Sequence, residues 1–88
     1  MKYSFLIAPS FLRQLKKLEP ALQDEVIEKL ELLKDRANHK RLQVHALKGL
    51  YKGRHACSIN FRYRVIFRFG PSKTDISLLS VGDHSIYD

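Results

Sequence analysis

Residues 61–69, with the sequence FRYRVIFRF, constrain the fold of this chain more than any other segment. Their side chains alternate between apolar and mostly cationic, and a period of two is typical of a β-strand whose two faces meet different surroundings. One face holds Phe61, Tyr63, Val65, Phe67 and Phe69, and the other holds Arg62, Arg64, Ile66 and Arg68. We therefore predict a central strand that packs its apolar face on helices and presents guanidinium groups on the other face.

Two more strands are predicted beside this segment, over Arg54 to Ile59 and over Thr74 to Val81. Asn60 and residues 70–72 supply turn residues between the strands, and such short connections favour an antiparallel meander. By the same alternation, His55, Cys57 and Ile59 share one face of the strand that precedes the central one. The sequence leaves open whether that face is the one that carries the arginines.

In the first part of the chain, the sequence pattern predicts a strand followed by a helical hairpin. The strand runs from Tyr3 to Ala8, Ser10 is expected to cap the first helix, and the second helix runs from Pro20 to about Lys34. The apolar positions at helical spacing are Phe11, Leu12, Leu15 and Leu18 in the first helix and Leu22, Val26, Ile27, Leu30 and Leu33 in the second. Residues 35–53 predict a loop with an extended piece around Leu42 to Leu47. We expect one α+β domain over residues 1–88, with the strand and hairpin packed on a small antiparallel sheet.

The excess positive charge is confined to the middle of the chain. Residues 1–35 contain six basic and six acidic side chains, whereas residues 36–74 contain ten basic side chains and no acidic one. Charge that served solubility alone would be interspersed with acids, whereas a segregated cluster is what binding to a phosphate backbone requires. We therefore expect the stretch from Arg36 to Thr74 to form a basic surface suited to nucleic acid. The side chains expected to hold RNA are Lys48, Lys52, Arg54, Arg62 and Arg68.

Length and cysteine content indicate how many hydrophobic cores the chain can form and in which compartment we expect it. A chain of 88 residues has room for one hydrophobic core. Its single cysteine, Cys57, cannot form an internal disulfide, and the apolar run from Tyr3 to Ala8 is too short for a signal peptide or a membrane span. We expect a cytoplasmic protein with no membrane partner.

The last residues, SVGDHSIYD, hold the strongest candidates for chemistry. His84 lies between Asp83 and Tyr87, and an imidazole moves protons near neutral pH, as RNA cleavage through a ribose 2′-hydroxyl requires. Arg64 and its neighbours would stabilise the extra negative charge on phosphorus. The sequence has no phosphate-binding loop and no metal-ligand spacing, so we expect any catalysis to need no metal or other cofactor. The alternative is a tail that packs Ile86 and Tyr87 on the sheet.

Three segments resemble the RelE/ParE superfamily of bacterial toxins from type II toxin–antitoxin systems. They are HALKGLYKGRH at 45–55, FRYRVIFRF at 61–69 and SVGDHSIYD at 80–88. The order of the predicted elements, which is a strand, two helices and a meander with a short tail, is also that of the family. The resemblance implies a RelE-like fold over nearly the whole chain.

The resemblance also implies roles for individual residues. It implies phosphate stabilisation by Arg64, a basic role in the terminal motif for His84, and nucleotide contact by Tyr87. His45 looks like a histidine that shares the acid–base work in the YafQ-like branch. Where RelE members carry catalytic lysines, this chain has His55 and Cys57, and His55 could replace a lysine as proton donor or phosphate contact.

A RelE-like or YafQ-like member would be an mRNA interferase, an endoribonuclease that cuts mRNA in the ribosomal A site. The resemblance implies further partners as well: a cognate antitoxin that blocks the basic face, and operator DNA reached through that antitoxin. Two alternatives stay open. One is a ParE-like toxin that inhibits gyrase without cleaving RNA, and the other is a nucleic-acid-binding module without catalysis.

Overall fold

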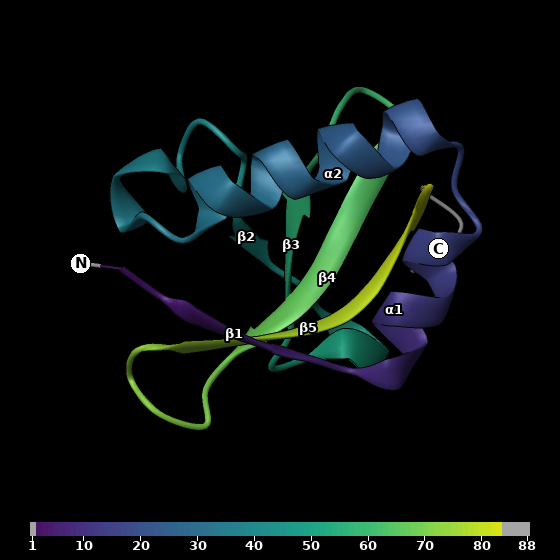
Figure 1. Ribbon diagram of the computed structural model, residues 1–88. Coiled ribbons are helices and arrows are strands. Elements are labelled where there is room, and N and C mark those ends of the chain that lie inside the picture. Colours follow the sequence, from purple (N-terminus) through teal and green to yellow (C-terminus); the bar gives the residue numbers. More distant parts are fainter. Residues whose placement is uncertain (1, 84–88) are drawn as a thin grey trace.

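A five-stranded sheet is the framework of the protein, and β4 lies at its centre in the order β1-β5-β4-β3-β2. The computed structural model describes residues 2–83 (Figure 1). The strands are β1 (Ser4–Ile7), β2 (His45–Ala46), β3 (His55–Ser58), β4 (Tyr63–Phe69) and β5 (Asp75–Asp83). The predicted antiparallel meander is confirmed as β3, β4 and β5, and β1 extends the sheet by pairing in parallel with β5.

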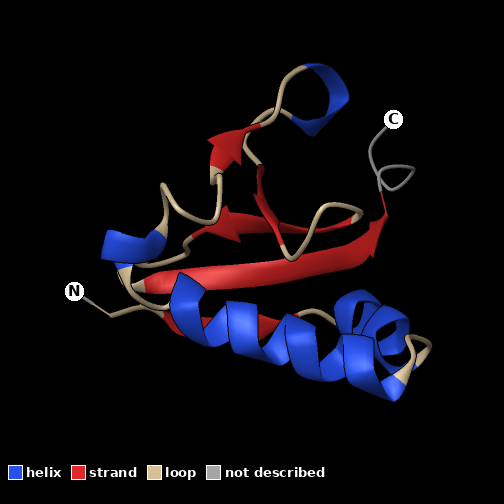
Figure 2. Ribbon diagram, turned by 90° about the horizontal axis from the view of Figure 1, so that it is seen from above, coloured by secondary structure: helices blue, strands red, loops and turns tan. Residues whose placement is uncertain are grey.

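Two α-helices, α1 (Pro9–Lys16) and α2 (Pro20–Leu33), lie on one face of the sheet (Figure 2). Each begins with a proline, whose missing N–H and fixed φ suit the first helical turn. The predicted cap is wrong, because Ala8 takes the N-cap position of α1 and the hydroxyl of Ser10 donates to the carbonyl oxygen of Leu79 at 2.8 Å. Within residues 2–83, neither helix is long and apolar enough to span a membrane.

The segment predicted as a loop over residues 35–53 contains two single-turn 3-10 helices and a short strand. The helices are η1 (Arg36–Asn38) and η2 (Gly49–Tyr51), and β2 lies within the extended piece that the sequence predicts. Gly49 begins η2 and Gly53 follows it, with φ of 67° and 90°, conformations that favour glycine. These turns let η2 stand off the sheet on the side opposite the two α-helices (Figure 2).

The hydrophobic core lies between the α-helices and the sheet face that carries Val65 and Phe67. Its buried members are Tyr3, Phe11, Val26, Leu30, Leu33, Leu42, Cys57, Ile59, Val65, Phe67, Ile76, Leu78 and Val81. Leu12 and Ile27 belong to the predicted apolar stripes of the helices, yet they are 42% and 50% exposed. The apolar stripes of both helices are therefore wider than the surface that the core buries.

The second half of β5 extends beyond β1, and α1 covers its open edge. β1 pairs with β5 only as far as Leu78. After that point, the carbonyl oxygen of Leu79 accepts from Ser10, and the side-chain oxygen of Gln14 accepts the N–H of Val81 at 2.9 Å. The register with β4 also shifts by one residue here, which leaves Leu79 as the extra residue of a β-bulge. Two polar side chains of α1 thus take the place of a neighbouring strand.

We expect Gln14→Ala to lower the free energy of unfolding by about 1–3 kcal/mol, because the part-buried N–H of Val81 would lose its acceptor. Urea denaturation followed by circular dichroism measures this loss. The matched control is Lys16→Ala on the exposed side of the same helix, which should stay within about 0.5 kcal/mol of the wild type. Equal stabilities for the two variants would show that Gln14 does not support the edge of β5.

Candidate nucleic-acid interface

The face of the sheet opposite α1 and α2 carries three of the predicted functional side chains, those of His45, Arg64 and Arg68. Directly paired residues of neighbouring strands point to the same side of a sheet, and Arg64 pairs with Ser58 while Ile66 pairs with Ala56. Ala56 in turn pairs with His45 on β2. We call this surface the arginine face and define it by His45, Ser58, Arg64 and Arg68, whereas Ile66 between the two arginines is buried.

The guanidinium group of Arg64 is held in place by the β3–β4 turn. Its Nη1 donates to the carbonyl oxygens of Asn60, at 2.6 Å, and of Tyr63, at 3.0 Å. Asn60 is itself fixed, because its side-chain oxygen accepts the N–H of Tyr63 at 2.9 Å and its amide donates to Glu25 of α2 at 2.7 Å. Arg64 is also half-buried. A cation oriented in this way loses little conformational freedom when an anion binds.

More cations lie on the same side of the molecule, toward the end of β4 that is remote from Arg64. Arg68 is exposed at the other end of β4, and Lys48 and Lys52 are exposed on the connection that carries η2. Arg54 lies with its guanidinium 5.8 Å from the centre of the Tyr51 ring. Within residues 2–83, none of these four cations forms an ion pair with an acidic side chain. Their charge is therefore available to a phosphate backbone.

Arg62 departs from the predicted alternation. β4 begins at Tyr63, and Arg62 lies in the preceding turn, where its N–H donates to the side-chain oxygen of Asn60 at 2.9 Å. Its guanidinium lies 5.5 Å from the centre of the Tyr63 ring and 3.9 Å from the carboxylate of Asp83. Tyr63 packs against the core, and Asp83 is its partner across the strands. Arg62 therefore belongs to the helix-facing side, and its predicted place on the same face as Arg64 is corrected.

His45 lies on the arginine face and is exposed. Its Nδ1 lies 2.8 Å from the carbonyl oxygen of Gln43, and since a carbonyl only accepts, Nδ1 carries the proton. The Nε2 atom of the neutral ring is then left to accept a proton. The pairing of β2, β3 and β4 places the Cα atoms of His45 and Arg64 about 12 Å apart on the same side of the sheet.

His55 lies on the opposite face, among the aromatic side chains of the core. Its ring stacks on Phe67 at 5.9 Å and meets Phe69 edge-on at 4.7 Å. Its Nδ1 is buried and has no hydrogen-bond partner in the described part of the chain. Burial, and to a smaller extent the charge of His45, lowers the pKa of His55. The predicted cooperation of His55 with Arg64 is therefore not supported by its position.

Cys57 shares the core-facing side of β3 with His55. Burial raises the pKa of the Cys57 thiol to about 12, so the thiol is not ionised near neutral pH. Cys57 therefore packs as a small apolar residue and offers no charge.

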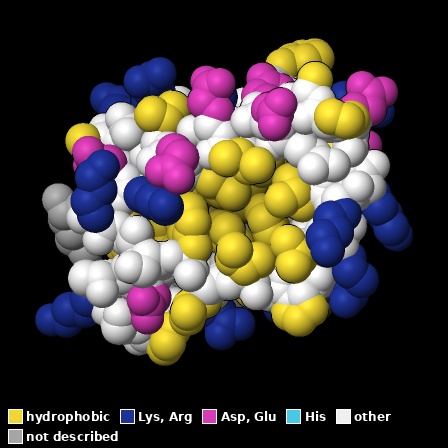
Figure 3. Space-filling view, in the orientation of Figure 1, with side chains coloured by type: hydrophobic (Ala, Val, Ile, Leu, Met, Phe, Trp, Pro, Cys, Tyr) yellow, Lys and Arg dark blue, Asp and Glu magenta, His cyan; other side chains and the backbone are white. Residues whose placement is uncertain are grey.

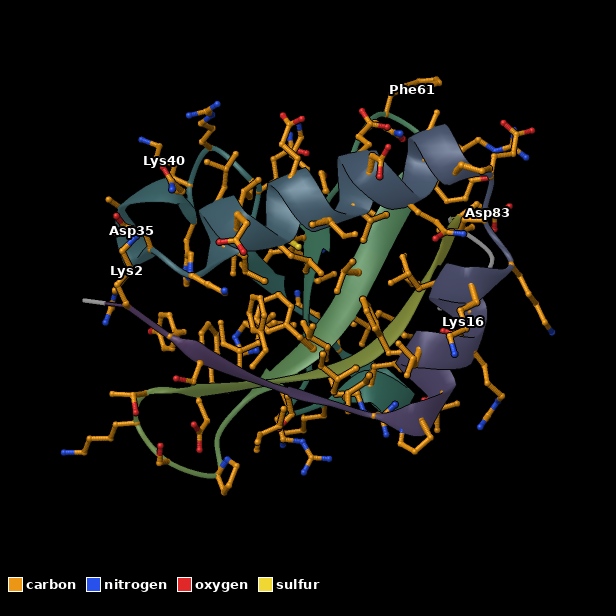
Figure 4. The ribbon with its side chains drawn as sticks, viewed as in Figure 1. Lys2, Lys16, Asp35, Lys40, Phe61 and Asp83 are labelled. Atoms are coloured by element: carbon orange, nitrogen blue, oxygen red, sulfur yellow. The ribbon has the colours of Figure 1, made fainter. Side chains whose placement is uncertain are left out.

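His84 and Tyr87 lie outside the described residues. The chain is described as far as Asp83, whose neighbour Gly82 pairs with Arg64. Figure 4 shows Asp83 at the end of the sheet near the start of α2. The terminal motif therefore begins on the strand that pairs with Arg64.

Comparison with solved structures supports the RelE-like fold. A chain of the toxin–antitoxin complex RelBE2 from Mycobacterium tuberculosis aligns with a TM-score of 0.79 and 21% identity, covering 96% of this chain and 100% of its own. YafQ from Escherichia coli aligns with a TM-score of 0.79 and 11% identity, covering 99% and 100%. A chain of the YoeB–YefM complex from Staphylococcus aureus aligns with a TM-score of 0.72 and 15% identity, covering 96% and 99%.

No protein-family model matches the sequence, and no curated protein matches it either. The identities to the solved structures are low, so these likenesses establish the architecture. The chain has the fold of RelE, YafQ and YoeB toxins, as the three sequence segments predict.

The lowered pKa of His55 predicts that the protein loses stability in mild acid. The unfolded chain has the ordinary histidine pKa of 6.5, so below that pH it binds more protons than the folded chain and the free energy of unfolding falls. The decrease in the free energy of unfolding should begin near pH 6.5 and level off below the pKa that His55 has in the folded state. Urea denaturation between about pH 7.5 and 5 measures this decrease.

His55→Phe, which keeps an aromatic ring at this position, should remove most of this pH dependence. His45→Gln is the matched control and should remove little of it, because burial affects the pKa of His55 more than the charge of His45 does. A His55→Phe variant as sensitive to acid as the wild type would contradict the assignment.

Proposed function

We propose that this protein is the toxin of a toxin–antitoxin system and that it cleaves mRNA in the ribosomal A site. The observation that carries the proposal is the arginine face, where the turn anchors Arg64 and further cations without ion pairs in residues 2–83 lie along the same side of the sheet. The likeness to structures of RelE, YafQ and YoeB supports the same conclusion. The toxin would act in the cytoplasm, where mRNA and ribosomes are found.

The proposed reaction is transfer of a phosphodiester within the RNA. The 2′-oxygen attacks phosphorus, the P–O5′ bond breaks, and the products are a 2′,3′-cyclic phosphate and a 5′-hydroxyl. A general base takes the proton of the 2′-hydroxyl, and a general acid donates one to the leaving 5′-oxygen. Arg64 stabilises the additional negative charge on the phosphoryl oxygens in the transition state.

His45 and His84 are the proposed pair for the proton transfers. His45 has the exposed position and the Nε2 atom that a general base needs, whereas His55 lies behind the sheet. His84 follows the part of β5 that pairs with Arg64. Tyr87 would stack on a base of the RNA or orient it. Because the site lacks the lysines of RelE, alignment of the mRNA by the ribosome would supply much of the rate.

Loss of Arg64 or of His84 should abolish toxicity. We expect Arg64→Ala to lower the cleavage rate by about a hundredfold to a thousandfold, as removal of a transition-state donor does. His45→Gln and His84→Ala should lower it by about a hundredfold or more. The measurements are growth arrest after induction in bacteria and primer-extension mapping of cuts in a translated mRNA.

The matched control for these variants is Arg13→Ala, an exposed arginine on α1, which should leave arrest and cleavage unchanged. Plasmid supercoiling is measured in the same cultures. Growth arrest with altered supercoiling and without codon-phased cuts would replace the ribonuclease by a gyrase-inhibiting toxin.

The antitoxin would bind the helix-covered side of the molecule. Figure 3 shows hydrophobic side chains gathered between α2, β1 and α1, with acidic side chains above them on α2 and basic ones to either side. The same three elements carry exposed large apolar residues, namely Ile7 (54%), Leu12 (42%) and Ile27 (50%). An apolar surface rimmed by charges fits the apolar side of an amphipathic segment. The complexes RelBE2 and YoeB–YefM support an antitoxin as its source.

Charges placed on this surface should free the toxin from its antitoxin. We expect Leu12→Glu and Ile27→Glu together to weaken the complex at least tenfold, because the antitoxin would bury two carboxylates. Co-expression with the neighbouring antitoxin gene measures neutralisation, and calorimetry measures affinity. The control is Phe61→Glu, since Phe61 is 93% exposed but points away from this surface at the β3–β4 turn (Figure 4). Full neutralisation of the double variant would place the antitoxin elsewhere.

A further inference from the structure

A cavity of about 670 Å³ lies at the end of the sheet remote from Arg64. Tyr3, Arg36, His39, Phe69 and the hairpin residues 70–73 line it. In Figure 1 the β4–β5 hairpin lies at the side of the N-terminus, and in Figure 4 Asp83 lies at the opposite side. Its volume falls within the range of about 300–1,000 Å³ that small-molecule sites occupy.

Aromatic rings form the floor of this cavity. Tyr3 and His39 stack with their ring centres 5.5 Å apart and an angle of 18° between the rings. Phe69 is tilted against both, at 5.6 Å from Tyr3 and 5.9 Å from His39. His39 is fixed in orientation, because its Nε2 lies 2.9 Å from the carbonyl oxygen of Leu33 and donates to it. Tyr3 is buried beneath, whereas His39 and Phe69 are only half-buried and present their rings to a ligand.

Cations without acidic partners form the rim. Arg36 on η1 and Lys73 in the hairpin are both exposed, and within the described residues neither forms an ion pair. The carboxylates next to them in the sequence or hairpin have other partners: Asp35 accepts the N–H of Ala37 at 3.0 Å, and Asp75 accepts the N–H of Ser72 at 3.2 Å. The rim is thus able to receive an anion.

We propose that this cavity binds one nucleotide unit, with the base against His39 and Phe69 and the phosphate between Arg36 and Lys73. An aromatic floor stacks with any base, and two cations that form no ion pair within the described residues bind the phosphate. The nucleotide has two possible sources, a free mononucleotide or one residue of a bound RNA strand. The site is separate from the arginine face, because about 17 Å of β4 lies between Arg64 and Phe69.

NMR spectroscopy of the ¹⁵N-labelled full chain tests the proposal. AMP should shift the amide signals of residues 36–39 and 69–74 in a saturable manner. Adenosine and inorganic phosphate, each holding half of the ligand, should bind at least about tenfold more weakly than AMP. A titration in which AMP shifts signals of the arginine face alone would overturn the proposal.

Substitutions at Arg36 and Lys73 then test whether these two side chains bind the phosphate of AMP. Arg36→Glu with Lys73→Glu should weaken AMP binding by about tenfold to a hundredfold, because two charge-assisted contacts become repulsive. Lys16→Glu on α1 is the control and should bind AMP as the wild type does. A double variant that keeps wild-type affinity would refute the site. Titration with a short single-stranded RNA separates the two sources: weaker RNA binding in the double variant indicates a residue of RNA, and unchanged RNA binding indicates a free mononucleotide.

Discussion

The pleat of β4 is the constraint on which the rest of the structure depends. Val65 and Phe67 are fully buried in the core, and burial of such side chains contributes about 1.5–3 kcal/mol each. A slip of one residue in register would move them to the surface and carry arginines into the core. Because that exchange is prohibitive, the core fixes Arg64 and Arg68 on the opposite face. The same side chains that stabilise the fold thereby position the cations.

The N-terminal part of the chain completes the site without contributing to its chemistry. Ser10 and Gln14 satisfy the backbone of β5 beyond the end of β1, so β5 continues as a strand to the point where Gly82 pairs with Arg64. Glu25 on α2 holds the amide of Asn60, whose carbonyl oxygen holds Arg64. Packing of the helical hairpin is therefore coupled to the geometry of the arginine face.

The sequence predicted the elements that depend on local pattern. The alternation in β4 and the helical spacing in α2 are local signals, and the structure confirms both. The strand was predicted to include Arg62, but the side-chain oxygen of Asn60 accepts the N–H groups of Arg62 and Tyr63 and forms a turn there. The face of His55 could not be predicted, because it depends on the β3–β4 register. The contact of Asn60 with Glu25 joins residues 35 apart, and no local pattern reports such a pair.

The two sides of the sheet impose a condition on any inhibitor of this protein. The apolar surface between α2, β1 and α1 lies on one side, whereas Arg64 and His45 lie on the other, so a segment bound to the first leaves the second open. An antitoxin that blocks RNA must therefore pass around an edge of the sheet. The β1 edge suits such a path, because Leu6 is 47% exposed there and, through its pairing with Ser77 next to Arg68, faces the arginine side. An amphipathic segment followed by an acidic one would match both surfaces in turn.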